Sequence, residues 1–281
     1  MFVRNVLQEI HARLSPLSDS PTLDAQVLLA HTIGKTRTWI LAHPDAHISN
    51  EQKEYLQQSV DRLALGEPLP YVLGRWEFYG LDFTVTPDVL IPRPETEILV
   101  DKAKAWLFEH PSMRFAVDIG TGSGCMAISL AVHIPDLVIL ASDISLPALK
   151  VTQQNMIQHN VTKQVFPVAA DLFPPTQNRF DLICANLPYI PINRLRKLEI
   201  FGREPDLALD GGTHGLDLIE EILHEAPEYL IEGGRMLLEI DSSQGLIIKN
   251  IARRVFPDAN VDVMNDLTGD ERLVSIQTTS A

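Results

Sequence analysis

A glycine-rich segment and an aspartate further along the chain have the spacing of a site for a nucleoside-containing cofactor. The segment runs from Asp118 to Gly124 with the pattern Asp-x-Gly-x-Gly-x-Gly, and it follows a predicted buried strand and opens a predicted helix. Glycines allow a tight turn there and let a ligand lie close to the backbone. Asp143 ends the next predicted strand, where a carboxylate can accept hydrogen bonds from ribose hydroxyls.

The residues around the glycines indicate the class of cofactor. A dinucleotide fingerprint, Gly-x-Gly-x-x-Gly, would need glycine at position 125, and the chain has Cys125 there. Carboxylates at Asp118 and Asp143 suit a cationic cofactor better than a pyrophosphate. S-adenosylmethionine, which carries a sulfonium and an ammonium group, is such a cofactor. A glycine loop by itself could also be a structural strand-to-helix turn, but the position of Asp143 favours a cofactor site.

A second segment, Asn-Leu-Pro-Tyr, follows the buried-strand pattern Phe180–Ala185. Asn186 should point into the ligand crevice at the strand end, where its side-chain oxygen can accept a hydrogen bond from a planar NH2 group. A backbone carbonyl in the turn can accept the second hydrogen, Pro188 restricts the shape of the turn, and Tyr189 offers a flat face. Two acceptors would hold a poorly nucleophilic nitrogen in line with a methyl carbon. The tetrapeptide could also be an ordinary turn, but its place in this sheet favours a substrate site.

The elements that must position these residues alternate between strand and helix after residue 91. Helices are predicted at about Glu95–Glu109, Asp217–Leu230 and Gln244–Val255. Strands are predicted at Phe115–Ile119, Val138–Ser142, Gln164–Val168, Asp181–Ala185, Arg235–Ile240, Val261–Met264 and Leu273–Gln277. This alternation is typical of an α/β fold with a doubly wound, mostly parallel sheet.

The first third of the chain has the apolar spacing of helices. Two helical patterns precede a third helix, which begins at the capping-box pattern Ser49–Gln52 and ends near Leu65. Trp76–Tyr79 and Leu81–Val85 then predict two short strands around a turn at Gly80. We therefore predict a helical domain at 1–70, a β-hairpin linker at 71–90 and an α/β domain at 91–281.

Composition limits the classes of function. The 281 residues carry a formal net charge of −14, which disfavours generic nucleic-acid binding; −11 of it lies after residue 85. A basic cluster, Arg194, Arg196 and Lys197, could be a solvated face or a contact for a partner protein or its bound RNA. The two cysteines, the absence of a secretory signal pattern and the absence of a long apolar run predict a cytoplasmic protein outside the membrane. No zinc-type spacing occurs, so we expect no catalytic metal, and Cys125 and Cys184 are expected to be buried apolar residues.

Several segments together resemble the bacterial peptide chain release factor glutamine methyltransferases, and the resemblance covers nearly the whole chain. Its most specific parts are Pro-Arg-Pro-x-Thr-Glu and Glu-Pro-x-x-Ala-Leu. Besides the two segments described first, the matching stretches are Ile91–Glu97, Glu204–Leu209, Gly211-Gly212, Gly215-Leu216, Leu238–Ile240 and Asn265–Arg272. Members of this family methylate the side-chain amide of the glutamine in the Gly-Gly-Gln motif of class 1 release factors.

The resemblance implies a class I S-adenosylmethionine-dependent methyltransferase: a Rossmann-like, doubly wound, mostly parallel seven-stranded sheet with a small all-helical N-terminal domain for substrate recognition. It implies S-adenosylmethionine as cofactor, S-adenosylhomocysteine as product and release factors as partners of a monomer that reads no nucleic-acid sequence. The implied cofactor contacts are Asp118, Gly120, Thr121, Gly122, Ser123, Gly124, Asp143, Leu172 against the adenine, and Asn186. The implied catalytic residues are Asn186, Pro188 and Tyr189, and the substrate pocket adds Leu187 and Arg93. Arg93 and Glu95 could shape the mouth of the pocket, or Arg93 could simply tie the linker to the sheet.

The sequence departs from the family pattern at two positions. Leu187 replaces the first proline of Asn-Pro-Pro-Tyr, which keeps the backbone carbonyl but loosens the turn, and Asp241 stands where glycine usually follows Glu-Ile. Three other functions stay open at this stage. They are an adenine-N6 or guanine-N2 nucleic-acid methyltransferase, a silent binding module with the same fold, and a nucleotide-linked dehydrogenase, which Cys125 opposes.

Overall fold

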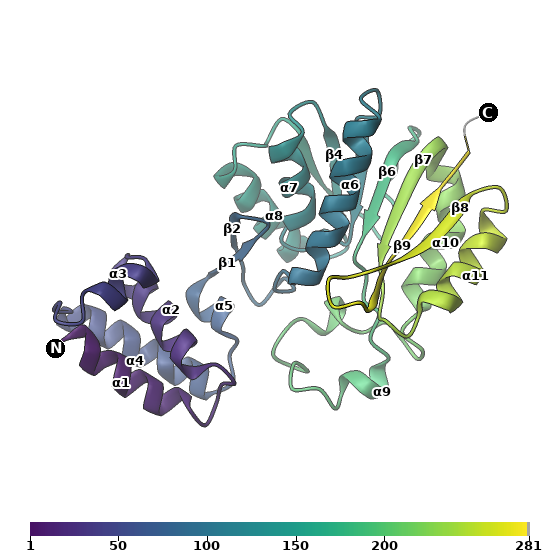
Figure 1. The fold of residues 1–281 in the computed structure, drawn as a ribbon. Helices are drawn as coiled ribbons and strands as arrows, with labels where there is room; N and C mark the ends of the chain where they lie inside the picture. Colours follow the sequence, from purple (N-terminus) through teal and green to yellow (C-terminus); the bar gives the residue numbers. More distant parts are fainter. Residues whose placement is uncertain (280–281) are drawn as a thin grey trace. The chain divides into compact units, whose positions relative to one another are not determined.

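The computed structural model describes residues 1–279 and divides the chain into two compact units, Met1–Arg75 and a larger unit that begins at Trp76 (Figure 1). The boundary lies inside the predicted linker 71–90. Val72 belongs to the hydrophobic core of the first unit, whereas Phe78 and Phe83 belong to a core of the second. The packing of the segment is therefore divided between the two units.

The first unit is all-helical, as the apolar spacing predicts. Its helices are α1 (Val3–Leu14), α2 (Pro21–Ile33), α3 (Arg37–Ala42), α4 (Asn50–Ala64) and α5 (Leu69–Leu73). The capping box at the start of α4 is confirmed, because the Gln52 N–H donates to Ser49 Oγ at 3.1 Å and the Ser49 N–H donates to Gln52 Oε1 at 2.8 Å. The two short helices α3 and α5 were not predicted. Each is too short to show an apolar period and depends on burying a residue such as Ile40 or Val72.

A two-stranded hairpin opens the second unit, with β1 at Arg75–Phe78 and β2 at Leu81–Thr84. Both aromatic side chains that face inward, Phe78 and Phe83, are fully buried. Asn155 fixes the hairpin to the α/β fold: its side chain accepts from the Thr84 N–H at 2.8 Å and donates to the Thr84 carbonyl at 3.0 Å and the Ser123 carbonyl at 2.9 Å. The hairpin therefore also supports the glycine loop that contains Ser123.

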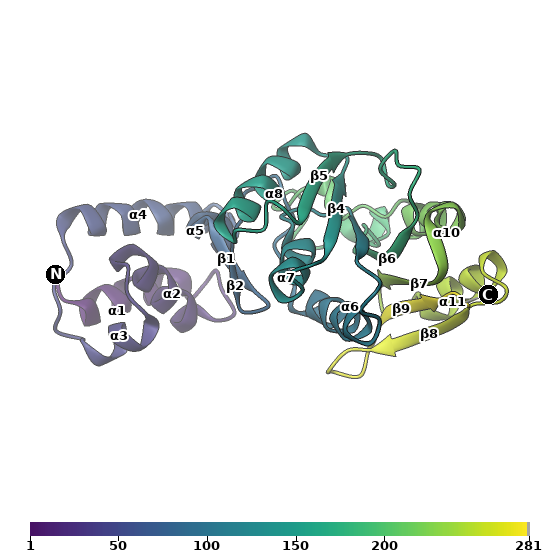
Figure 2. The same ribbon diagram turned by 90° about the horizontal axis from the view of Figure 1, so that it is seen from above.

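The second unit is built on a seven-stranded sheet with the order β5-β4-β3-β6-β7-β9-β8 (Figure 2). All pairs are parallel except those of β9 with β7 and β8, which confirms the predicted doubly wound, mostly parallel sheet. The strands are β3 (Phe115–Ile119), β4 (Val138–Asp143), β5 (Val165–Ala169), β6 (Phe180–Ala185), β7 (Leu230–Glu239), β8 (Asn260–Asn265) and β9 (Glu271–Gln277).

Helices cover both faces of this sheet, so successive strand residues are buried on opposite sides. Ala116 of β3 belongs to the core cluster that includes residues of α6 and α7, and Val117 to the one that includes residues of α10 and α11. The helical segments are η1 (Pro94–Thr96), α6 (Glu97–Glu109), α7 (Cys125–His133), α8 (Leu146–Gln158), α9 (Ile192–Leu195), η2 (Asp206–Ala208), α10 (Asp217–Tyr229) and α11 (Gly245–Val255).

The course of the chain across the sheet places the site. From β3 the chain passes outward through β4 to β5, and then returns to β6 on the other side of β3. Ligands of open α/β sheets bind at the carboxyl ends of the strands beside such a reversal. The residues that follow β3 and β6 are Gly120 and Asn186, so the topology brings the two predicted motifs together.

Several predicted boundaries differ from the structure, and that of β7 differs most. Strand β7 begins at Leu230 rather than Arg235, because its register with β6 shifts between the Phe180–Leu230 and Leu182–Arg235 pairs and the extra residues are accommodated as a bulge. The helix predicted from Glu95 begins as a 3-10 turn, and regular α-helix starts only at Glu97. Among residues 1–279, no helix has the length and apolar character needed to cross a membrane.

Replacing Asn155 tests its role as the anchor of the hairpin. We expect Asn155→Ala to lower the free energy of unfolding by about 3 kcal/mol, because it leaves backbone groups at Thr84 and Ser123 without their partners. Urea titration followed by circular dichroism measures the change. The matched control is Gln154→Ala, an exposed neighbour on the same helix, which should change stability by less than about 0.5 kcal/mol. Equal effects of the two substitutions would contradict the assignment.

Candidate active site

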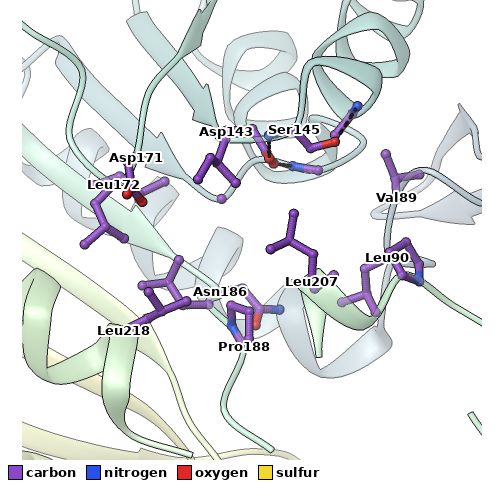
Figure 3. Close-up of a pocket in the computed structure, with 18 of the residues that line it drawn as sticks. Val89, Leu90, Asp143, Ser145, Asp171, Leu172, Asn186, Pro188, Leu207 and Leu218 are labelled. Atoms are coloured by element: carbon purple, nitrogen blue, oxygen red, sulfur yellow. Dashed lines mark hydrogen bonds between the residues drawn. The ribbon is translucent and has the colours of Figure 1, made fainter. Parts of the chain in front are cut away.

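A cavity of about 150 Å³ lies at the carboxyl ends of β3, β4 and β6. Figure 3 shows Leu172 at one end and Leu90 at the other, with Asp143 and Asn186 on the walls between them. Of the residues predicted to bind the cofactor, those on the wall are Gly120, Gly122, Asp143, Leu172 and Asn186. The structure thus gathers residues from four separate segments of the chain around one space.

The glycine loop presents its backbone to this cavity. Gly120 and Gly122 have φ angles of +71° and +56°, which side chains rarely tolerate. A Cβ on Gly122 would meet nothing within 4 Å, so this residue faces open space, whereas a Cβ on Gly124 would lie 2.8 Å from Thr152 Cγ2. Thr152 also donates its hydroxyl hydrogen to the Gly122 carbonyl at 2.8 Å. The loop is therefore held by Thr152 on one side, and on the other side Gly122 faces open space.

Asp118 lies behind the loop and not on the cavity wall. Its side chain is fully buried, and Oδ2 accepts hydrogen bonds from the Thr121 hydroxyl at 2.7 Å and the Ala127 N–H at 3.2 Å. Oδ1 has no hydrogen-bond partner among the described residues, and burial raises the pKa of the carboxyl to about 7. Thr121, Ser123 and Gly124 are likewise absent from the wall, so these four predicted contacts lie within or behind the loop rather than on the cavity wall.

Asp143 and Leu172 are on the wall and are held there by hydrogen bonds. The Gly122 N–H donates to Asp143 Oδ2 at 2.8 Å and the Ser145 N–H donates to Oδ1 at 2.9 Å, as drawn in Figure 3. Burial raises the pKa of Asp143 above its usual value, and these backbone donors oppose the rise. Leu172 has the left-handed φ of 57°, and its carbonyl accepts from the Ser142 hydroxyl at 2.9 Å. Such backbone strain is typical of ligand sites.

The charge of the cavity distinguishes among ligand classes. Its wall includes the carboxylates Asp88, Asp143 and Asp171, and no Lys, Arg or His among the described residues that line it. A pyrophosphate would meet only like charge there, whereas a cationic ligand is stabilised. Cys125 and Cys184 are buried away from the wall, and burial raises the pKa of Cys125 to about 12 and that of Cys184 well above its usual value. Neither thiol can serve as a nucleophile in this state.

A second cavity of about 110 Å³ adjoins the first. Asn186, Leu187 and Pro188 line both cavities, and Tyr189 and Arg93 line only the second. All the residues predicted for the substrate pocket are therefore together. Asn186 lies where the two cavities meet.

Arg93 has a structural role as well as a place on this wall. Its Nη2 donates to Glu204 Oε1 at 2.5 Å, and Glu204 Oε2 accepts from the Ile91 N–H at 3.0 Å. Glu204 is buried, so the ion pair ties the Pro-Arg-Pro segment to the segment that contributes Leu207 and Ala208 to the cavity lining. This contact gives both family-specific patterns, Pro-Arg-Pro-x-Thr-Glu and Glu-Pro-x-x-Ala-Leu, a physical reason.

The backbone of the Asn-Leu-Pro-Tyr segment is fixed by close contacts. A Cβ on Gly211 would lie 2.8 Å from the Pro188 carbonyl oxygen, and one on Gly215 would lie 2.2 Å from the Tyr189 carbonyl oxygen. Gln244 Nε2 also donates to the Tyr189 carbonyl at 3.0 Å. Glycine is required at both positions because a neighbouring backbone occupies the space of a side chain.

The two departures from the family pattern have structural explanations. Leu187 is buried, and its Cδ2 would lie 3.1 Å from a Cβ on Gly120, so its side chain fills the space between the two motifs. Asp241 accepts from Arg194 Nη1 at 2.9 Å and from the Ser243 N–H at 3.1 Å. Burial alone would raise the pKa of Asp241, but these hydrogen bonds and the Arg194 charge hold it below its usual value. One member of the basic cluster is thereby paired.

Several wall residues were not predicted from the sequence. Asp171 follows β5 and could have been found from the rule that strand ends carry ligand contacts. Leu207 and Leu218 come from segments that approach the cavity only through the tertiary fold, and no local pattern marks them. Thr96 and Glu239 occur in motifs of the resemblance, but nothing in the sequence indicates that they contact Asn186 and Tyr189, respectively.

Comparison with known proteins first defines the class. Residues 5–74 match the family model described as the PrmC N-terminal domain, and residues 96–197 match the methyltransferase small domain. The fold is similar to the solved structure of a methyltransferase from Pyrococcus furiosus, with a TM-score of 0.52 and 19% identity over 83% of this chain and 100% of that one. Fold and site together define a Rossmann-like methyltransferase of the S-adenosylmethionine-dependent class.

Full-length relatives define the family. The release factor glutamine methyltransferase of Moorella thermoacetica is 39% identical over 97% of this chain and 97% of its own length. The protein of the same name from Coxiella burnetii is 38% identical over 84% of this chain and 85% of its own. This chain belongs to the release factor glutamine methyltransferase family.

Two glycines of the loop provide a matched test of its geometry. We expect Gly122→Ala to lower the free energy of unfolding by about 1 kcal/mol, the cost of a left-handed alanine in open space. Gly124→Ala should cost about 3 kcal/mol, because the overlap with Thr152 is added to the same backbone strain. Urea titrations of both variants measure the difference. Equal losses would mean that the loop is packed differently from the structure.

Proposed function

We propose that this chain transfers a methyl group from S-adenosylmethionine to the side-chain amide nitrogen of the glutamine in the Gly-Gly-Gln motif of class 1 peptide chain release factors. S-adenosylhomocysteine is the second product, and the enzyme acts as a cytoplasmic monomer. One observation carries the proposal: Asn186 lines both an acidic cavity at the strand ends and the narrower cavity beside it. The family of the chain supports the choice of substrate.

The first cavity suits the cofactor. When bound, S-adenosylmethionine supplies an electrophilic methyl group on a sulfonium sulfur. Asp143 keeps carboxylate lone pairs for ribose hydroxyls after accepting its two backbone hydrogen bonds, and Leu172 provides an apolar surface for the adenine. The open face of Gly122 lets the ligand approach the backbone. Asp118, with an unpartnered oxygen, adds negative charge behind the loop.

The second cavity suits a planar amide. Asn186 Oδ1 and a backbone carbonyl of the following turn accept the two amide hydrogens, and the Tyr189 ring covers the flat group. Held in this way, the amide nitrogen would direct its lone pair at the methyl carbon of a bound cofactor. Transfer would form an N–C bond, leave the former C–S bonding pair on S-adenosylhomocysteine, and release one proton from the nitrogen to water. Alignment of the nitrogen contributes most of the rate enhancement in this proposal.

The helical unit is proposed to recognise the release factor. In this proposal the chain consists of a substrate-recognition domain at 1–70, a hairpin linker at 71–90 and a methyltransferase domain at 91–281. Its match to the PrmC N-terminal domain supports this role. A nucleic-acid amino group is the alternative substrate, since Asn-x-Pro-Tyr could hold an exocyclic NH2 in the same manner. The remaining exposed members of the basic cluster, Arg196 and Lys197, are its main support, and the strongly acidic composition opposes it.

Methyl transfer from labelled S-adenosylmethionine tests the proposal directly. The acceptors are a purified release factor, the same factor with glutamate in place of the Gly-Gly-Gln glutamine, DNA and ribosomal RNA. We expect label in the first acceptor only, because the glutamate variant has no amide nitrogen. Label in either nucleic acid and not in the release factor would replace this function with the alternative.

Asn186 is expected to be indispensable for the same reaction. Asn186→Ala removes the side-chain acceptor that aligns the amide, so kcat should fall at least about 100-fold. Steady-state kinetics with the release factor measures the loss, and circular dichroism verifies that the fold persists. Activity close to that of the wild type would show that the amide binds elsewhere.

Asp143 is expected to control cofactor affinity. Asp143→Ala removes the acceptor for the ribose hydroxyls and leaves the Gly122 N–H without its partner, so the Kd for S-adenosylmethionine should rise at least about 10-fold. Isothermal titration calorimetry measures the change, with exposed Asp258→Ala as a control. An unchanged Kd would place the ribose away from β4.

A further inference from the structure

We propose that Gln244 is a positioning residue: its buried side-chain amide holds the backbone at Tyr189 and thereby sets the position of the Tyr189 ring in the substrate cavity. The inference rests on the proposed function and deepens it, because Tyr189 is the residue proposed to cover the flat amide of the substrate. Gln244 itself lines neither cavity, so it acts through the residues that it contacts.

The side chain of Gln244 connects three loops at the carboxyl ends of the strands. Its Nε2 donates to the Tyr189 carbonyl at 3.0 Å, in the segment after β6, and to the Gly215 carbonyl at 2.9 Å, just before α10. Its Oε1 accepts from the Asp241 N–H at 3.0 Å, in the loop after β7. Gln244 is only 5% exposed, and hydrogen bonds shielded from water in this way are electrostatically stronger.

The chemistry of the partners fixes the orientation of the Gln244 amide. Backbone carbonyls can only accept and the Asp241 N–H can only donate, so the NH2 group must face the two carbonyls and the oxygen must face Asp241. The reversed amide would place an oxygen against two oxygens and a donor against a donor. In the observed orientation both hydrogens of Nε2 are used. The amide therefore has one arrangement, and it holds the Tyr189 carbonyl in one direction.

Gly215 provides the space for this contact. A Cβ there would lie 2.2 Å from the Tyr189 carbonyl oxygen and 3.0 Å from Gln244 Nε2, and the φ of Gly215 is +75°, which favours glycine. The loop before α10 is therefore shaped around the hydrogen bond between Gln244 and Tyr189.

Tyr189 is consequently fixed at its ring and at its backbone. The peptide group that follows it is bonded at both ends: its carbonyl accepts from Gln244, and its N–H, that of Ile190, donates to the Leu209 carbonyl at 3.2 Å. The Tyr189 hydroxyl donates to Glu239 Oε1 at 3.3 Å. Tyr189 lies between these contacts on the wall of the second cavity. Without the Gln244 amide the peptide group could rotate, and the ring would move with it.

Removal of the amide tests the proposal. Gln244→Met keeps an unbranched side chain of similar length but has no NH2 group, and we expect kcat with the release factor to fall about 10- to 100-fold because the ring is displaced. The Kd for S-adenosylmethionine should change less than about 3-fold, because neither Gln244 nor its three partners line the first cavity. Gln153→Met, at an exposed position, is the matched control. A Gln244→Met enzyme with wild-type kcat would overturn the proposal.

A double-mutant cycle separates positioning from a purely structural role. Tyr189→Ala removes the ring through which Gln244 acts, so adding Gln244→Met to it should change kcat by less than about 3-fold. Losses that multiply in the double variant would show that Gln244 acts independently of the ring, and would overturn the proposal. Circular dichroism verifies the fold. If Gln244→Met does not fold, Gln244→Glu replaces it, since glutamate keeps the acceptor for the Asp241 N–H and lacks the NH2 group. A wild-type enzyme that leaves the release factor unmethylated would instead overturn the proposed function, and this inference with it.

Discussion

The orientation of one side-chain amide, that of Asn186, is the constraint on which the rest of the site depends. It stands at the end of β6, where two cavities meet, and its usefulness depends on which of its atoms faces the ligand. Gly211, Gly215 and Gln244 hold the backbone that follows it, and Thr96 holds its nitrogen. These residues come from three separate parts of the chain, around positions 96, 211–215 and 244, and their shared task explains why small and polar residues occur there.

Negative charge is the second constraint on the site, because burying carboxylates raises their pKa values. Asp143 is supported by backbone N–H groups, whereas Asp118 and Glu239 are fully buried and their pKa values rise to about 7. Buried carboxylates with raised pKa values are typical of functional sites. The cavity itself is lined by the carboxylates Asp88, Asp143 and Asp171 and by no cation among the described residues. Such a cavity favours a positively charged ligand.

Much of the fold follows from local patterns, because strand and helix periodicity depends on which residues must be buried. All the predicted strands are present, and the capping box at Ser49 starts α4 as expected. Local patterns were less informative about boundaries that tertiary contacts determine. The strand predicted from Arg235 begins five residues earlier, because β7 continues through Gly233 and Gly234 as a bulge against β6. The predicted linker is likewise divided, because Val72 and Phe78 are buried in different cores.

The sequence by itself determined the chemistry of this protein: the glycine spacing, the carboxylate at position 143, and an amide followed by a restricted turn and an aromatic ring. These are short-range features, and the chain order of a doubly wound sheet brings their strand ends together. Only the tertiary structure decided how those groups are used. It placed Asp118 behind the loop, paired Arg93 with Glu204, and brought Thr96 next to Asn186 and Gln244 next to Tyr189. Hydrogen bonds between residues so far apart in the chain have no local signature, because their partners are set by how helices and strands pack.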